Sequence, residues 1–218
     1  MKFINRLRIG KLFVQLVFNP KNTELIFEGV RIVSADGDDK LFKEIETTYL
    51  SSQDFLDLYE SRYNPVPPKL EKLKSYAPGT FGRALYQHLS DHNLSLEIFP
   101  RFEFHRPIEF LSLRAYQDHD LWHVLLGRSV EIEDELAVQA FGVAQYGSPV
   151  ASLLIAGGLL HLLWKSPMRA AKALEGISAN YQLGKRAKLL VGLKLQDLFD
   201  LPLPEARRFC GLEIGVTN

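Results

Sequence analysis

The chain has 218 residues, of which 46% are hydrophobic, and its 26 Lys plus Arg balance 26 Asp plus Glu. Zero net charge excludes a global polyanion binder of the kind that coats nucleic acid. The length supports one well-filled core, so we expect a single domain over residues 1–218.

Short helices are expected in the N-terminal part of the chain. Apolar residues at helical spacing predict a first helix that ends at Asn19-Pro20, followed by short helical segments over residues 23–33 and 41–45. Ser51 or Ser52 is a suitable N-cap for the next helix, which ends before the proline-rich connector 65–68. That connector makes residues 1–64 a candidate N-terminal helical subdomain.

The rest of the chain also has a helical pattern. Thr80 is a good N-cap, Pro107 suits a first helical turn, and Ser148-Pro149 and Ser166-Pro167 repeat a cap-plus-proline start. The helix before Ser148 is expected to end at Tyr146-Gly147, and final helical segments are expected over residues 189–199 and 203–210. Because no alternating apolar run is bounded by hairpin turns, we predict an all-α, single-domain helical bundle.

A histidine pair with metal-ligand spacing lies in the stretch before Gly127. On an α-helix, His119, Asp120 and His123 project at about 0°, 100° and 40°, within one sector of the helix. Gly127 is placed to end that helix in the left-handed conformation. These three side chains are therefore candidate ligands of one metal ion.

A fourth candidate ligand follows the predicted helix end. Glu135 lies about one turn into the next helix, as His123 lies about one turn before the break, so a helix hairpin would bring the two together. Two imidazoles and two carboxylates suit Zn²⁺, Fe²⁺ or Mn²⁺, and Mg²⁺ less naturally. We expect a divalent metal, Zn²⁺ first among these.

The histidines also have other interpretations. Histidines at helical spacing are common in cores and on surfaces. The HDxxH pattern also resembles the HExxH of zinc peptidases, although Asp120 is one methylene shorter than the usual Glu. A metal-dependent phosphohydrolase of the HD type would recruit His88, His92 or His105, and no spacing in the chain favours them.

A long apolar segment runs from Val150 to Trp164. Ser152 and His161 interrupt it, and it is shorter than the about 20 residues that a membrane span requires, so it is not expected to be a transmembrane helix. It is either a buried core helix or the wall of a lipid groove. Gly157-Gly158 indicates close approach of a helix or a ligand, and the charges that follow are mostly basic.

Several motifs resemble the coenzyme Q (ubiquinone) biosynthesis protein 4 family. His119-Asp120-x-x-His123, eleven further residues and Glu135 reproduce that family's HDxxH-x11-E signature. The segment 78–83, Arg114 five residues before the first histidine, and Leu126-Gly127 after the second also match the family pattern. The resemblance runs from about Pro78 to the end of the chain.

The resemblance implies an all-helical protein that binds a divalent metal and a polyisoprenoid at a membrane surface. The implied role is in ubiquinone synthesis, either in oxidative decarboxylation at C1 of a prenylated hydroxybenzoate ring or as a non-catalytic scaffold for the other enzymes. Arg114 is expected to bind the lipid head group. The expected lining of the prenyl tail is Leu154, Gly157, Gly158 and His161.

Partners and location follow from the same expectation. We expect a polyisoprenyl lipid or prenylated quinone precursor, a membrane surface, other quinone-biosynthesis enzymes and a second copy of the chain in a dimer, with no nucleic acid. Cys210 is the only cysteine, so no disulfide framework exists, and a reducing compartment fits best. The expected location is cytoplasmic, peripheral on the inner face of a membrane.

Overall fold

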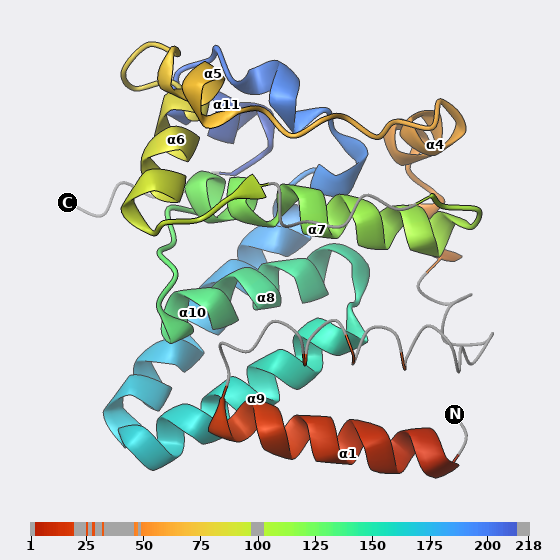
Figure 1. Cartoon of the computed structure of the whole chain (residues 1–218), viewed down its shortest axis with the longest axis vertical. Helices are drawn as coiled ribbons and strands as arrows, with labels where there is room; N and C mark the ends of the chain where they lie inside the picture. Colours follow the sequence, from red (N-terminus) through yellow and green to blue (C-terminus); the bar gives the residue numbers. More distant parts are fainter. Residues whose placement is uncertain are drawn as a thin grey trace. The chain divides into compact units, whose positions relative to one another are not determined.

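The computed structural model describes residues 3–19, 49–96 and 103–212, together with the single positions 25, 28, 32, 46 and 47. The predicted helix over residues 41–45 lies outside the described residues, and of the predicted helix over residues 23–33 only positions 25, 28 and 32 are described. Within the described residues the chain forms α-helices (Figure 1) and 3₁₀ turns, and no strand is assigned there. The predicted all-α fold is confirmed.

The chain divides into two compact units, each built from two separate segments. Unit 1 consists of Met1–Thr47 and Glu131–Lys185, and unit 2 consists of Thr48–Val130 and Arg186–Asn218. The proline-rich connector lies inside unit 2. Each unit is therefore described by itself.

Unit 1 contains four described helices: α1 (Phe3–Phe18), α8 (Ile132–Tyr146), α9 (Pro149–Lys165) and α10 (Pro167–Arg186). Gly147 ends α8 with φ = 69°, a conformation that glycine adopts without steric cost. Ser148 then caps α9, its hydroxyl accepting from the backbone of Ala151 at 3.1 Å. These caps follow the predicted pattern.

Close packing of α9 against α8 explains one of the paired glycines. A Cβ at Gly158 would lie 2.5 Å from Cδ2 of Leu136, a side chain buried in a cluster with Leu162, Ala170 and Ala173. Gly158 therefore allows the two helices to approach. The neighbouring α1 runs along α9 (Figure 1), and His161 on α9 donates from Nδ1 to the carbonyl oxygen of Val17 at 2.8 Å.

Unit 2 contains the remaining helices. They are α4 (Gln53–Glu60), α5 (Leu70–Lys74), α6 (Phe81–Asp91), α7 (Pro107–Leu126), the 3₁₀ turns η2 (Leu190–Gly192) and η3 (Leu195–Leu198), and α11 (Leu203–Phe209). The N-caps of α4 and α6 are Ser52 and Thr80, as predicted. The chain joins α6 to the start of α11 through one antiparallel bridge, Thr80 to Pro202.

One helix prediction is wrong. Residues 189–199 form η2 and η3 in place of a continuous helix, with Leu193 extended between them at φ = −107° and ψ = 147°. The guanidinium of Arg114 donates hydrogen bonds to the carbonyl oxygens of Val191 and Leu193, so these two carbonyls are not available to a regular helix. A continuous helix would have used those carbonyls internally.

The apolar helix α9 is not a membrane span. No helix in the described part of the chain is both long enough and apolar enough to cross a bilayer. Ala151, Gly157, Gly158 and Leu162 of α9 are buried, whereas Trp164 near its C-terminal end is 73% exposed. The helix therefore contributes both to the core of unit 1 and to its surface.

Candidate metal centre

Helix α7 holds the predicted histidine pair in a fixed orientation. At its start, the carboxylate of Glu109 accepts from the backbone of Arg106 at 3.1 Å, and Pro107 occupies the first turn. At its end, Gly127 has φ = 65°, the predicted left-handed conformation. His119 and His123 lie one turn apart within this helix, and His123 is only 1% exposed.

The two imidazoles face each other through the same ring nitrogen. Nε2 of His119 and Nε2 of His123 are 3.2 Å apart. Nδ1 of His123 lies 3.0 Å from the carbonyl oxygen of Ser129. Because a carbonyl only accepts, Nδ1 carries the proton and, in the neutral ring, Nε2 keeps its lone pair.

This separation fits two ligands of a tetrahedral ion. With Zn–N bonds of about 2.0 to 2.1 Å, two tetrahedral nitrogen ligands lie about 3.3 to 3.4 Å apart. The observed 3.2 Å is shorter than that by about 0.1 to 0.2 Å. The bond from His123 to Ser129 is the kind of outer contact that fixes a ligating imidazole.

The predicted carboxylate ligands come from different parts of the chain. Asp120 is buried on α7, next to His119 in sequence. Glu135 is in the first turn of α8 and belongs to unit 1, whereas both histidines belong to unit 2. As donors, His119, His123 and Glu135 make a set that is compatible with a divalent metal ion. Asp120 is not a member of that set.

Helix α6 adds two histidines that the sequence did not assign to this centre. The ring of His88 stacks on that of His123, with centroids 5.4 Å apart and an interplanar angle of 23°. The ring of His92 lies 5.1 Å from that of His88. Their i, i+4 spacing repeats that of His119 and His123, and this repetition was the available sequence signal.

Arg114 lies apart from the histidine pair and is 1% exposed. Its guanidinium donates to the carboxylate of Asp118 at 2.7 Å and to the carbonyl oxygens of Leu193 at 3.0 Å and Val191 at 3.4 Å. These contacts tie α7 to η2 within unit 2. A bond to a lipid head group would have to replace them.

The partner of Arg114 is a strongly perturbed acid. Burial raises the pKa of Asp118 to about 7, against the opposing effect of the Arg114 charge and hydrogen bond. Both side chains are almost fully inaccessible, at 2% and 4% exposure. The pair is therefore a buried ionic link inside unit 2.

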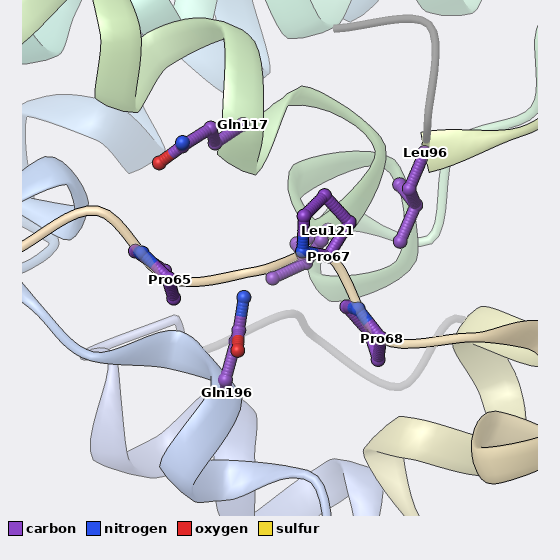
Figure 2. A pocket seen from close by; sticks show the side chains of 7 residues that line it. All are labelled: Pro65, Pro67, Pro68, Leu96, Gln117, Leu121 and Gln196. Atoms are coloured by element: carbon purple, nitrogen blue, oxygen red, sulfur yellow. The ribbon is translucent and has the colours of Figure 1, made fainter. Parts of the chain in front are cut away.

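A small pocket lies beside α7 in unit 2. It is lined by residues of the connector, α7 and η3 together with one further leucine: Pro65, Pro67, Pro68, Leu96, Gln117, Leu121 and Gln196 (Figure 2). Its volume of about 20 Å³ is close to that of one water molecule, far too small for a quinone ring. Gln117 is further fixed by donating to Asn64 at 2.8 Å.

The residues expected to line a prenyl tail all lie on α9 in unit 1. Gly157 and Gly158 are buried, and Leu154 and His161 are partly buried. Within unit 1, Gly158 packs against Leu136, and His161 is hydrogen-bonded to the carbonyl oxygen of Val17. Lining of a tail remains a prediction for these four positions.

Known proteins with similar sequences share one description. The family model of the coenzyme Q (ubiquinone) biosynthesis protein Coq4 matches residues 41–214. The mitochondrial ubiquinone biosynthesis protein COQ4 of Mycosarcoma maydis is 27% identical over 166 residues, covering 75% of this chain and 44% of that protein. The mitochondrial COQ4 homolog of Bos taurus is 28% identical over 149 residues, covering 67% of this chain and 54% of that protein.

A solved structure has the same fold. The crystal structure of a protein from Nostoc punctiforme, described as a candidate ubiquinone biosynthesis protein, matches with a TM-score of 0.78 and 21% identity. The match covers 93% of this chain and 96% of that one. By contrast, the chain spans about half the length of the curated relatives that it matches.

Proposed function

This chain belongs to the coenzyme Q (ubiquinone) biosynthesis protein 4 family, and on that premise we propose that it acts in the synthesis of a ubiquinone-type quinone. Within that role it is a metal-dependent protein that binds a polyprenyl lipid. The proposed metal binding rests on the His119–His123 pair, whose Nε2 atoms are 3.2 Å apart. The curated relatives carry ubiquinone biosynthesis in their descriptions.

The proposed ligand set is His119, His123 and Glu135, with Asp120 as a fourth ligand or an outer contact. Five residues separate the end of α7 from the start of α8, so the chain itself limits how far Glu135 can lie from His123. Mixed imidazole and carboxylate donors suit Zn²⁺, and also Fe²⁺ or Mn²⁺. When bound, the ion would supply Lewis-acid polarisation of a ring carboxylate or phenolate.

The proposed reaction is oxidative decarboxylation at C1 of a prenylated hydroxybenzoate ring. The bond from C1 to the carboxylate carbon breaks, CO₂ leaves, and a hydroxyl group whose oxygen comes from water forms on C1. Starting from the ring carboxylate and water, this step releases two electrons and one proton. Dioxygen takes up the two electrons, together with that proton and one more from solvent, and leaves as hydrogen peroxide. The chain's own part is to hold the ring carboxylate beside His119 and His123 and to exclude bulk water from the buried His123.

Product analysis of the metal-loaded chain tests this reaction. The chain would be incubated under air with a synthetic short-chain prenylated hydroxybenzoate, and the C1-hydroxylated product would be sought by mass spectrometry. His123→Ala should form none, and His105→Ala, which changes an exposed histidine elsewhere in unit 2, should retain activity. A wild-type chain that binds the metal and the precursor but forms no product would contradict the proposed enzymatic activity.

A non-catalytic scaffold that gathers quinone-biosynthesis enzymes is the second candidate. Its support is the donor count, because His119, Asp120, His123 and Glu135 together would close a tetrahedral ion, as structural zinc sites are closed. Three protein ligands would leave an open position for substrate. A crystal structure of the zinc-loaded chain distinguishes them, since a water molecule on the ion favours the enzyme and a fully protein-ligated ion favours the scaffold.

We also propose that unit 1 associates with a membrane surface. Exposed apolar side chains gather where α9 passes into α10, with Trp164 at 73% and Met168 at 78% exposure, and Phe18 of α1 lies 5.5 Å from Trp164 by ring centroids. Lys165 beside them suits anionic lipid. Flotation with anionic vesicles should recover the wild-type chain, and Trp164→Ser should weaken recovery; equal recovery would contradict this surface.

The compartment and the assembly remain proposals. A cytoplasmic location was expected from the sequence, whereas the curated relatives are described as mitochondrial. Peripheral attachment to a membrane is compatible with either compartment. Dimer formation and contact with other quinone-biosynthesis enzymes are proposed from the family resemblance alone.

A further inference from the structure

Two helices of unit 2 each carry a histidine pair at i, i+4 spacing. His88 and His92 come from α6, and His119 and His123 come from α7. Consecutive rings are close in the order His92, His88, His123, His119, with centroid separations of 5.1, 5.4 and 4.8 Å. The four imidazoles therefore form one continuous histidine array.

The packing of α6 fixes the place of its pair. Leu85 and Leu89 are buried, and each lies three residues before one of the histidines, so the pair borders the apolar stripe about 60° around the helix. Thr80 caps this helix, its hydroxyl accepting from the backbone of Arg83 at 3.3 Å. The pair is thus presented by a regular, capped helix.

Exposure differs among the four histidines. His92 is exposed, His88 and His119 are partly buried, and His123 is 1% exposed. An ion arriving from solvent therefore meets His92 before His123. Imidazoles one helical turn apart can bind one divalent transition ion together, with water completing its coordination.

We propose that His88 and His92 form a second, weaker binding site for a divalent transition metal, at the solvent side of the candidate metal centre. Two imidazoles without a carboxylate hold Zn²⁺ less tightly than the inner set that includes Glu135, so the outer site captures an ion and releases it. The stacked rings of His88 and His123 place the outer site directly beside the inner one. The inference extends the proposed metal centre and rests on it for the identity of the inner site.

Calorimetric titration of the metal-free chain with Zn²⁺ alone tests this outer site. The wild-type chain should show one tight and one weaker class of sites. His92→Ala should weaken the second class by at least tenfold and leave the first within about twofold, because His92 is exposed and its removal leaves His123 packed. His105→Ala, the matched surface-histidine control, should titrate as wild type.

The outcomes separate this inference from the proposed function. A His92→Ala titration identical to wild type, or an equal loss in His105→Ala, would overturn the outer site. A His119→Ala/His123→Ala chain should keep only the weaker class. A wild-type chain with the weaker class alone, lost on His92→Ala, would support the outer site and contradict the proposed inner centre.

Discussion

Replacing Arg114 with methionine tests whether this residue stabilises the fold or binds a ligand. Methionine keeps the length of the side chain and removes its charge and donors. The carboxylate of Asp118 would lose its 2.7 Å partner while still buried, and the carbonyls of Val191 and Leu193 would lose their donor. At a pH well above 7, where Asp118 is ionised in the wild type, breaking the buried pair in this way costs about 3 to 5 kcal/mol in the free energy of unfolding.

A second variant separates the charge from the lost carbonyl contacts. In Arg114→Met/Asp118→Leu no unpaired charge remains. The carbonyl oxygens of Val191 and Leu193 and the side-chain oxygen of Gln117 lack their donor, which costs about 1 to 3 kcal/mol. The double variant should therefore be more stable than Arg114→Met by about 2 kcal/mol. This recovery is the signature of a buried ionic link.

Denaturant unfolding followed by tryptophan fluorescence measures these differences in unit 2. The chain has two tryptophans, and Trp122, 2% exposed in unit 2, will change its surroundings far more on unfolding than Trp164, which is 73% exposed. A normally stable Arg114→Met chain that fails to bind an isoprenoid phosphate would refute this reasoning and restore the predicted head-group role.

Three further predictions concern single positions. Gly158→Ala should lower the free energy of unfolding by about 1 to 3 kcal/mol, because the new Cβ would clash with Leu136. Gly10→Ala, whose Cβ would have no neighbour within 4 Å, should raise it by about 0.5 to 1 kcal/mol. Equal effects of the two variants in denaturant unfolding would contradict the close packing of α9 on α8. Burial raises the pKa of the Cys210 thiol to about 12, so an aromatic disulfide reagent should label it only after unfolding, and rapid native labelling would be the opposite result. The pKa of Asp118 in the folded chain, about 7, lies above its ordinary value of 3.8. The protonated form therefore stabilises the fold at low pH, and that stability is lost as pH rises through 7. Asp118→Asn should flatten this decrease in the free energy of unfolding with pH, and an unchanged pH profile would contradict the prediction.

Local sequence rules predicted the helix ends well. Ser52, Thr80 and Ser148 cap helices, and Gly127 and Gly147 end them, because each effect depends on one residue and its nearest turn. The stretch 189–199 was predicted wrongly because its carbonyls bind Arg114, almost eighty residues earlier in the chain. No local pattern contains that information.

The candidate site shows the same division between local and distant contacts. The His119–His123 pair follows from helical periodicity, so the sequence could predict it. The stacking of His88 on His123 depends on how α6 packs against α7, which no spacing along the chain specifies. Arg114 has the family's motif position, yet its burial and its bond to Asp118 are visible only in the folded unit.

Metal retention under competition shows whether His123 holds the proposed ion. The chain would be loaded with Zn²⁺, dialysed against a weak chelator that strips loosely held ions, and analysed by mass spectrometry for zinc per chain. One ion should be retained in the wild type and in His105→Ala, and none in His123→Ala. Equal zinc content in the wild type and His123→Ala would contradict this prediction.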